Sequence, residues 1–111
     1  MHGEQFAVAL VTAPDRETAR KISRAAVDQR AAACANLLPA VESIYRWEGE
    51  VQTDQEVLIL FKTRQSLMED FLIPLIKELH PYQVPEIIAL PITRGLEDYL
   101  DWIRGSTEKP D

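Results

Sequence analysis

Two apolar runs constrain the fold more than any other feature of this sequence. Phe6–Ala13 (FAVALVTA) is apolar at nearly every position, and residues 57–61 (VLILF) are apolar throughout. Short runs that are apolar on both faces are typical of strands in the centre of a sheet. A chain of 111 residues that contains two such strands has room for one domain and is too short for two well-cored ones.

The segments between and after these runs are typical of helices. Asp15 is a good N-cap for a helix over residues 16–30, because apolar residues follow it at helical spacing. Ser66 can cap a second helix that reaches residue 79, and Pro74 should kink or split that helix because proline lacks an N–H group. Residues 95–103 are expected to form a short terminal helix.

Two further strands complete the expected sheet. Residues 41–48 carry aromatic and β-branched side chains, and Gly49 is the expected turn of a hairpin whose return strand covers residues 51–63. Residues 85–92 form a short strand that carries Pro85 and Pro91, which argues for a sheet edge.

The order β-α-β-β-α-β plus a C-terminal helix is the ferredoxin-like arrangement of the α+β class, with an antiparallel sheet. We expect a single domain over residues 1–111, with its core at about 6–103, and right-handed crossovers that put the first and third strands in the centre. Both internal helices then cover one face. The other face is also apolar, so we expect another subunit to cover it; the alternative is that the terminal helix folds over it.

Charge and cysteine content limit the partners and the compartment. Twelve Lys and Arg against 18 Asp and Glu give a formal net charge of −6, which disfavours nucleic acid and anionic membranes as partners. No stretch has the 18 or more apolar residues of a membrane span. One cysteine, no disulfide and no recognisable signal peptide predict a cytoplasmic protein.

The densest group of chemically active side chains is the segment His80-Pro81-Tyr82-Gln83-Val84-Pro85-Glu86. Its prolines should hold it extended and rigid. His80 is suited to bind a metal or carry a proton, or else to cap the C-terminus of the preceding helix. Tyr82 can donate a hydrogen bond, and Glu86 can act as a base, a ligand or an ion-pair partner.

Four other positions carry side chains of interest, and two of them have two interpretations. Cys34 lies among alanines and is either a small buried hydrophobe or a soft copper ligand. Lys62 ends a strand and either holds an anion in a cleft or is solvated. Trp47 shares a strand face with Tyr45 and suits packing against a neighbouring subunit. His2, beside the amino terminus, is a weak copper site at most. A closed four-ligand zinc site within one chain is not available, whereas a site shared between subunits is.

Taken in order, several motifs resemble the CutA divalent-cation-tolerance family over residues 6–103. They are Val11-Thr12-Ala13-Pro14-Asp15, Ala32-Ala33-Cys34-Ala35-Asn36-Leu37-Leu38-Pro39, Tyr45-Arg46-Trp47-Glu48-Gly49, Lys62-Thr63, the segment from His80 to Glu86, and Tyr99-Leu100-Asp101-Trp102. The resemblance implies a tight homotrimer of ferredoxin-like subunits and a link to tolerance of copper and other divalent cations. It places copper on a Cys before Thr-Ala-Pro-Asp and on a His pair before Pro-Tyr; Val11 and Leu79 stand at two of those positions here, so only His80 is retained.

We therefore expect a trimeric copper-binding or other divalent-cation-binding protein, with His80 and Cys34 as metal ligands. Lys62, Tyr82, Glu86 and Trp47 are expected to line a signalling-type ligand cleft between subunits. A structural hub or protein-anchoring module is the alternative. A second alternative is an enzyme in which His80 and Glu86 act as acid and base on a small anionic substrate held by Lys62. We favour a binding protein over an enzyme and assign no catalytic residue.

Overall fold

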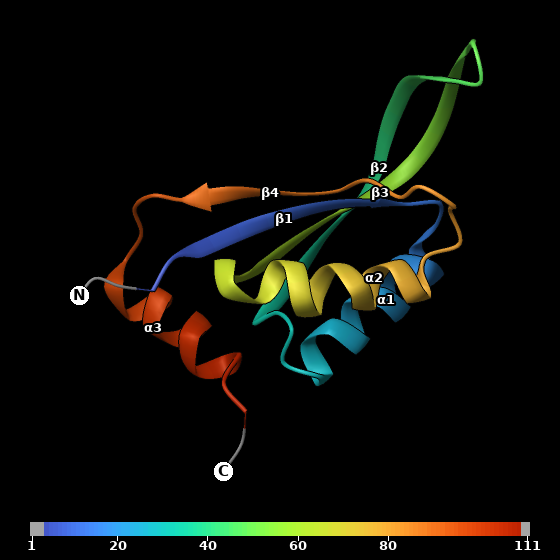
Figure 1. The fold of residues 1–111 in the computed structure, drawn as a ribbon. Helices are drawn as coiled ribbons and strands as arrows, with labels where there is room; N and C mark the ends of the chain where they lie inside the picture. The colour runs from blue at the N-terminus through green and yellow to red at the C-terminus, as the bar shows by residue number, and fades with distance from the viewer. Residues whose placement is uncertain (1–3, 110–111) are drawn as a thin grey trace.

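The computed structural model describes residues 4–109, and its centre is one four-stranded antiparallel sheet (Figure 1). The strands lie in the order β2-β3-β1-β4. Their bounds are Phe6–Ala13 for β1, Cys34–Trp47 for β2, Glu50–Arg64 for β3 and Ile87–Ile92 for β4. The two strands predicted to be central are central, and the α+β, ferredoxin-like order is confirmed.

Two helical segments, α1 (Arg16–Asp28) and α2 (Ile73–Leu79), pack on the same face of the sheet (Figure 1). Helix α1 begins as predicted, because the Asp15 side chain accepts a 2.8 Å hydrogen bond from Thr18 N. It ends at Asp28, and Arg30 takes a left-handed φ of 65° as the chain turns away. The helix is therefore two residues shorter than predicted.

Proline 74 divides the second helical region, as predicted. A 3-10 turn η1 (Gln65–Leu67) and a π-helical turn η2 (Met68–Leu72) precede α2, which carries Pro74 in its first turn. A proline there has no N–H to bond and its ring crowds the preceding turn, so a wider π turn is a favourable solution. The predicted Ser66 cap is wrong: Ser66 lies inside η1, and its hydroxyl donates to Glu4 Oε2 at 3.5 Å.

Strand β2 departs most from the sequence prediction, because it begins at Cys34, seven residues before residue 41. Its pairing with β3 is irregular between Leu38 and Val41, where Pro39 lies. Proline is tolerated on an edge strand or at a bulge because no ladder hydrogen bond is lost there. Proline 39 therefore interrupts the register without ending the strand.

Side chains alternate between the two faces of the sheet. The helix-covered face carries the core, in which Val11, Ile59 and Phe61 are fully buried. The other face, which we call the open face, presents large apolar side chains to solvent. Leu38 is 41% exposed, Ile88 53% and Leu90 55%. The predicted arrangement of one covered and one apolar uncovered face is present in the single chain.

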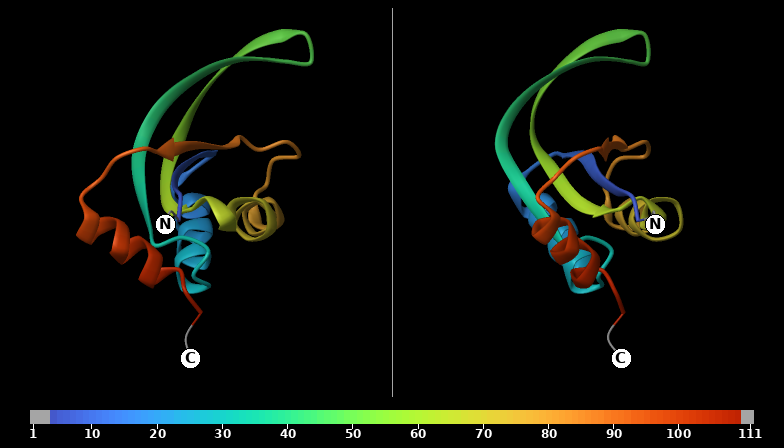
Figure 2. Two further views of the ribbon diagram at one scale, coloured as in Figure 1. Left: turned by 60° about the vertical axis from the view of Figure 1, so that its left-hand side comes forward. Right: turned by 90° about the vertical axis from the view of Figure 1, so that its left-hand side faces the viewer.

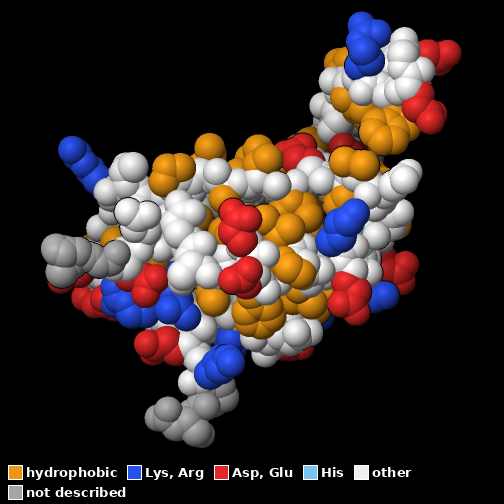
Figure 3. Space-filling model, in the orientation of Figure 1, with side chains coloured by type: hydrophobic (Ala, Val, Ile, Leu, Met, Phe, Trp, Pro, Cys, Tyr) orange, Lys and Arg blue, Asp and Glu red, His pale blue; other side chains and the backbone are white. Residues whose placement is uncertain are grey.

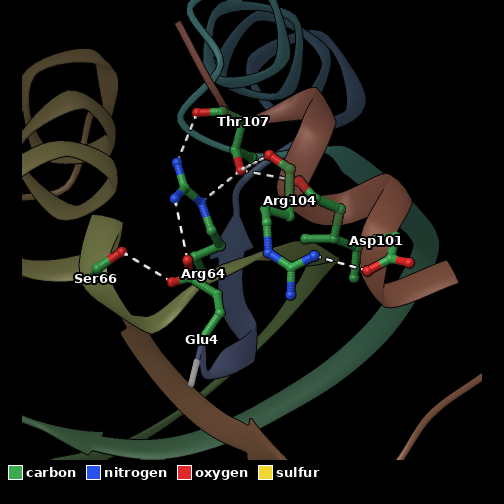
Figure 4. A network of polar contacts seen from close by, with 7 residues as sticks. Glu4, Arg64, Ser66, Asp101, Arg104 and Thr107 are labelled. Atoms are coloured by element: carbon green, nitrogen blue, oxygen red, sulfur yellow. Dashed lines mark hydrogen bonds and ion pairs between the residues drawn. The ribbon is translucent and has the colours of Figure 1, made fainter. Parts of the chain in front are cut away.

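Helix α3 (Glu97–Ser106) covers only one end of the open face. It buries Ile103 against Phe6 and Ala33. Arg64 at the end of β3 holds the helix: its Nε donates to Thr107 Oγ1 at 2.8 Å and its Nη2 donates to Thr107 O at 2.9 Å (Figure 4). The alternative in which the terminal helix covers the whole face is wrong, since Leu38, Ile88 and Leu90 remain exposed.

The β2–β3 hairpin projects from the body and curls over (Figures 1 and 2). Its turn is the pair Glu48-Gly49, with φ of 51° and 82°. Positive φ at both central residues is the type I′ geometry that suits the twist of a tight hairpin. The turn predicted at Gly49 is confirmed. None of the helices within residues 4–109 is long and apolar enough to cross a membrane.

Candidate functional site

A cavity lies between the hairpin and the loop that joins α2 to β4. Its volume is about 560 Å³, within the range typical of small-molecule sites. Figure 3 shows hydrophobic and acidic side chains gathered where the hairpin leaves the body. The lining residues come from β1, β2, β3 and the loop: Thr12, Ser43, Ile44, Tyr45, Trp47, Glu56, Tyr82, Gln83, Val84 and Glu86.

His80 fixes this loop to the central strand β1. His80 is only 7% exposed, its Nε2 lies 2.7 Å from Thr12 O, and its Nδ1 accepts from Tyr82 N at 3.1 Å. A carbonyl only accepts and a backbone N–H only donates, so these partners require a neutral ring with its proton on Nε2. His80 occupies the C-cap position of α2 as expected, but its ring bonds β1 rather than the helix end.

Tyr82 continues the connection from the loop to β3. Its hydroxyl donates to Glu56 Oε2 at 2.7 Å, and Glu56 is only 8% exposed. Burial, followed by the hydrogen bond to Glu56, raises the pKa of Tyr82 well above its ordinary value. On the hairpin, the Tyr45 hydroxyl donates to Asp54, and this bond raises the pKa of Tyr45. Both phenols are therefore held protonated and directed at carboxylates.

The cavity is acidic and aromatic. Glu56 and Glu86 contribute carboxylates and Tyr45, Trp47 and Tyr82 contribute rings, while no Lys or Arg is among the lining residues. Lys77 on α2 contacts the loop from outside the lining, with Nζ donating to Gln83 O at 3.0 Å. A negatively charged ligand would meet like charge here, so the anionic substrate considered from the sequence is electrostatically disfavoured at this cavity.

The structure brings together three of the predicted cleft residues and separates the fourth. Trp47, Tyr82 and Glu86 all line the cavity. Lys62 lies six residues from Glu56 on β3, a spacing of about 20 Å along a strand, and its ammonium donates to Asn36. Within one chain Lys62 therefore does not reach His80 or Glu86, and an acid-base pair assisted by Lys62 would need a second subunit.

Cys34 lies beside Lys62 rather than beside His80. The two residues are register partners across β2 and β3. The Cys34 sulfur is partly buried and lies 3.7 Å from the Tyr99 hydroxyl of α3. The predicted metal ligands thus belong to two separate places, the cavity wall and the α3 end of the open face.

The donor set of one chain does not fit a closed metal site. Residues 4–109 contain no group of three or more His, Cys, Asp and Glu side chains positioned to hold a metal. His80 would have to give up a hydrogen bond to use either ring nitrogen. His2 lies outside the described residues.

Sequence reasoning did not single out Glu56, the most buried carboxylate of the cavity. One signal was available: Glu56 comes directly before the apolar run 57–61 and shares the face of Leu58 and Leu60 at a period of two. Thr12 was also missed, because its contribution is a backbone carbonyl to His80, which no side-chain pattern reports.

Comparison with known proteins decides the family. The family described as CutA1 divalent ion tolerance protein matches residues 7–106. The chain belongs to this family. The divalent-cation tolerance protein CutA of Thermus thermophilus is 52% identical over 100 residues, which are 90% of this chain and 96% of that protein. Its structure superposes with a TM-score of 0.89 and covers 93% of this chain and 99% of that chain, at 50% identity.

A plant CutA is longer than this chain. The protein named CutA, chloroplastic, of Arabidopsis thaliana is 49% identical over 103 residues. Those residues are 90% of this chain and 54% of that protein, so the chain spans about half the length of this relative. Relatives of this chain therefore differ in length, and the name of one of them places that protein in the chloroplast.

Proposed function

We propose that this CutA chain acts as a homotrimer that binds divalent cations, copper(II) foremost, at sites completed by more than one subunit. Membership of a family described by divalent-ion tolerance is the observation that carries the proposal. His80 and Cys34 are the proposed ligands. The cytoplasmic location expected from the sequence stays a prediction, since the Arabidopsis relative is named chloroplastic.

The open face supports assembly. Leu38, Ile88 and Leu90 are each 41% to 55% exposed on a face whose centre is also apolar. Contiguous apolar surface of this kind marks an interaction site on a soluble domain, because burying it gains about 25 cal/mol per Å². A cyclic assembly of copies buries the same face on each subunit.

The donor chemistry favours a shared site over a site within one chain. Cys34 offers a soft sulfur that makes a weak 3.7 Å contact with the Tyr99 hydroxyl. His80 offers an imidazole nitrogen at the cost of a hydrogen bond in the loop. Each chain supplies one Cys34 sulfur and one His80 imidazole. A metal ion therefore gains two or three ligands of one kind only where symmetry brings copies from different subunits together.

Calorimetric titration of copper(II) into the full chain tests the proposal. Binding at a defined fraction of a site per subunit is expected, weakened at least tenfold in Cys34→Ser or His80→Gln. Trp102→Phe is the matched control on α3 and should bind as the parent does. Equal binding by the parent and both ligand variants would move copper to surface carboxylates or the amino terminus and overturn the assignment.

The hairpin supports a second candidate, a protein-anchoring hub. Ile44 is 66% exposed, Val51 61% and Trp47 45% on a projecting element. Exposed apolar side chains on a hairpin are suited to docking another chain. If the hairpin docks partners, Ile44→Ser with Val51→Ser should abolish a pull-down interaction that the parent trimer makes, while both proteins keep the same sedimentation coefficient.

A further inference from the structure

We propose that a second cavity, between α1 and the first residues of β2, binds a small phosphate monoester that carries an apolar substituent. This α1 cavity has a volume of about 320 Å³, at the lower end of the range typical of small-molecule sites. Five of its lining residues come from α1 and two from β2: Arg20, Ser23, Arg24, Val27 and Asp28, with Ala35 and Leu37. The proposal involves neither copper nor the hairpin.

The α1 cavity lies on the helix-covered side of the sheet. Ala35 and Leu37 are partly buried and pack against the core beneath α1. Leu38 follows directly and belongs to the open face, because successive side chains of a strand point to opposite faces. Copies of the chain that cover the open face therefore pack on the opposite side of the sheet from this cavity.

Two guanidinium groups give the cavity its positive charge. Arg20 and Arg24 are four residues apart on α1, so their side chains are neighbours on one helix face. Neither forms an ion pair within residues 4–109, where the ion pairs are those of Arg64 and Arg104. A guanidinium presents its N–H groups as a planar fork that matches the oxygens of a phosphate or a carboxylate. Two such groups side by side are suited to hold one oxyanion.

Ser23 adds a buried donor that the chain itself does not use. Ser23 is 7% exposed, and its hydroxyl is the one buried side-chain polar group of residues 4–109 that has no hydrogen-bond partner. A serine in a helix interior can bond the carbonyl four residues earlier, but Ser23 makes no such bond. A buried hydroxyl without a partner is costly. A phosphate oxygen beside Arg20 and Arg24 would accept the missing hydrogen bond.

The other lining residues indicate what the anion carries. Val27, Ala35 and Leu37 form an apolar wall, which suits an apolar substituent. Asp28 is the single carboxylate of the lining, against two guanidinium groups, so an anion is still attracted. The two guanidinium groups and the hydroxyl make three donor groups. These suit the three terminal oxygens of a phosphate monoester better than the two oxygens of a carboxylate.

Phenyl phosphate is a suitable probe, because it joins an apolar ring to a phosphate that is a dianion above its second pKa of about 6. It is titrated at about pH 8 and constant ionic strength into the full chain, in the assembly that the chain forms, and followed by phosphorus NMR. Saturable binding is expected. Calorimetry compares two analogues: benzoate should bind at least fivefold more weakly, and the neutral benzyl alcohol at least tenfold more weakly. Absence of saturable phenyl phosphate binding, or equal binding of benzoate, would overturn the proposal.

Charge variants test the site residue by residue. Arg20→Gln and Arg24→Gln should each weaken phenyl phosphate binding at least fivefold. Asp28→Asn should tighten it about twofold, because a repulsive charge is removed. Lys21→Gln removes the same charge from α1 outside the lining and is the matched control, with binding expected within twofold of the parent. An equal loss in all three variants that lack a positive charge would reduce the effect to general electrostatics and contradict the site.

Ser23→Ala separates a binding role from a structural one. It should weaken phenyl phosphate binding at least threefold. Its melting temperature without ligand should equal or exceed that of the parent, because the hydroxyl has no partner to lose. A lower melting temperature would show that the hydroxyl stabilises the fold, and unchanged binding would remove Ser23 from the site; either result contradicts the proposal.

Discussion

The Tyr82 hydroxyl donates a 2.7 Å hydrogen bond to the buried carboxylate of Glu56, and this bond joins the α2–β4 loop to the central strand β3. His80 joins the same loop to β1 through Thr12 O. The cavity beside the hairpin therefore has one wall fixed to the core of the sheet and one wall on a projecting element. Its shape depends on a small number of polar contacts that mutation can test one at a time.

Removal of the Tyr82 hydroxyl should destabilise the fold. In Tyr82→Phe the Glu56 carboxylate stays buried and loses its donor, which is expected to cost about 1–3 kcal/mol. Urea denaturation measures the loss. The double variant Tyr82→Phe with Glu56→Leu should recover part of it, because both polar partners are then gone. A double variant less stable than the sum of the singles would contradict this reading.

Tyr82 should also titrate at a higher pH than an ordinary tyrosine. Its pKa is raised in the folded state, so the bond's contribution to stability is complete below the unfolded pKa of about 10 and falls as pH rises from there through the folded pKa. Ultraviolet absorbance should show a tyrosine that ionises only at high pH or on alkaline unfolding. That component should vanish in Tyr82→Phe, and its persistence there would reassign it to another tyrosine.

Replacement of His80 should weaken the fold even without metal. His80→Ala removes two hydrogen bonds to backbone atoms of β1 and the loop and leaves a cavity, at an expected cost of about 2–4 kcal/mol. Thermal unfolding in the presence of a chelator measures it. Glu78→Ala, two residues earlier and exposed, is the control and should change stability by less than about 0.5 kcal/mol. A metal-free His80→Ala protein as stable as the parent would show that the ring has no structural role.

Two glycines should respond in opposite directions. Gly49 has a φ of 82° and an added Cβ would meet nothing within 4 Å, so Gly49→Ala should cost about 1 kcal/mol through the backbone alone. Gly105 lies inside α3 with equally open space around it, so Gly105→Ala should stabilise by about 0.5–1 kcal/mol. Denaturant midpoints of the two variants on opposite sides of the parent are expected; two shifts of the same sign would contradict the turn geometry.

The hydrogen bonds from Arg64 to Thr107 should limit local opening of α3. Its guanidinium bonds both the side chain and the carbonyl of Thr107, and Thr107 is only 3% exposed. Arg64→Lys keeps the positive charge but cannot make both hydrogen bonds to Thr107 at once. Faster amide exchange throughout α3 is therefore expected, at similar global stability. Unchanged exchange in α3 would mean that Ile103 packing alone holds the helix.

The strand order was predictable from the sequence because burial on both faces leaves a direct pattern. The runs at β1 and β3 are apolar at consecutive positions, and only central strands are buried in that way. The helix N-cap at Asp15 and the turn at Gly49 were equally local signals. By contrast, the early start of β2 was not predictable, since Pro39 and the small residues before it are typical of a loop, and only pairing with β3 makes them a strand.

The sequence predicted part of the candidate site, because side-chain chemistry is a local signal whereas position along a strand is not. Tyr82, Glu86 and Trp47 stood out by chemistry and proved to share a cavity. Lys62 and Cys34 stood out equally, but they lie at the other end of the sheet. Position along a strand depends on register, and register across β2 and β3 includes an irregularity at Leu38 and Val41 that single-sequence patterns do not encode.

Native mass spectrometry of the full chain with stoichiometric copper(II) tests the central claim most directly, because one spectrum reports both subunit number and bound metal. The proposed function predicts a trimer that carries a defined number of copper ions, with copper lost and the trimer kept in Cys34→Ser with His80→Gln. A monomeric parent, or a parent trimer whose copper content is the same in the double variant, would contradict it.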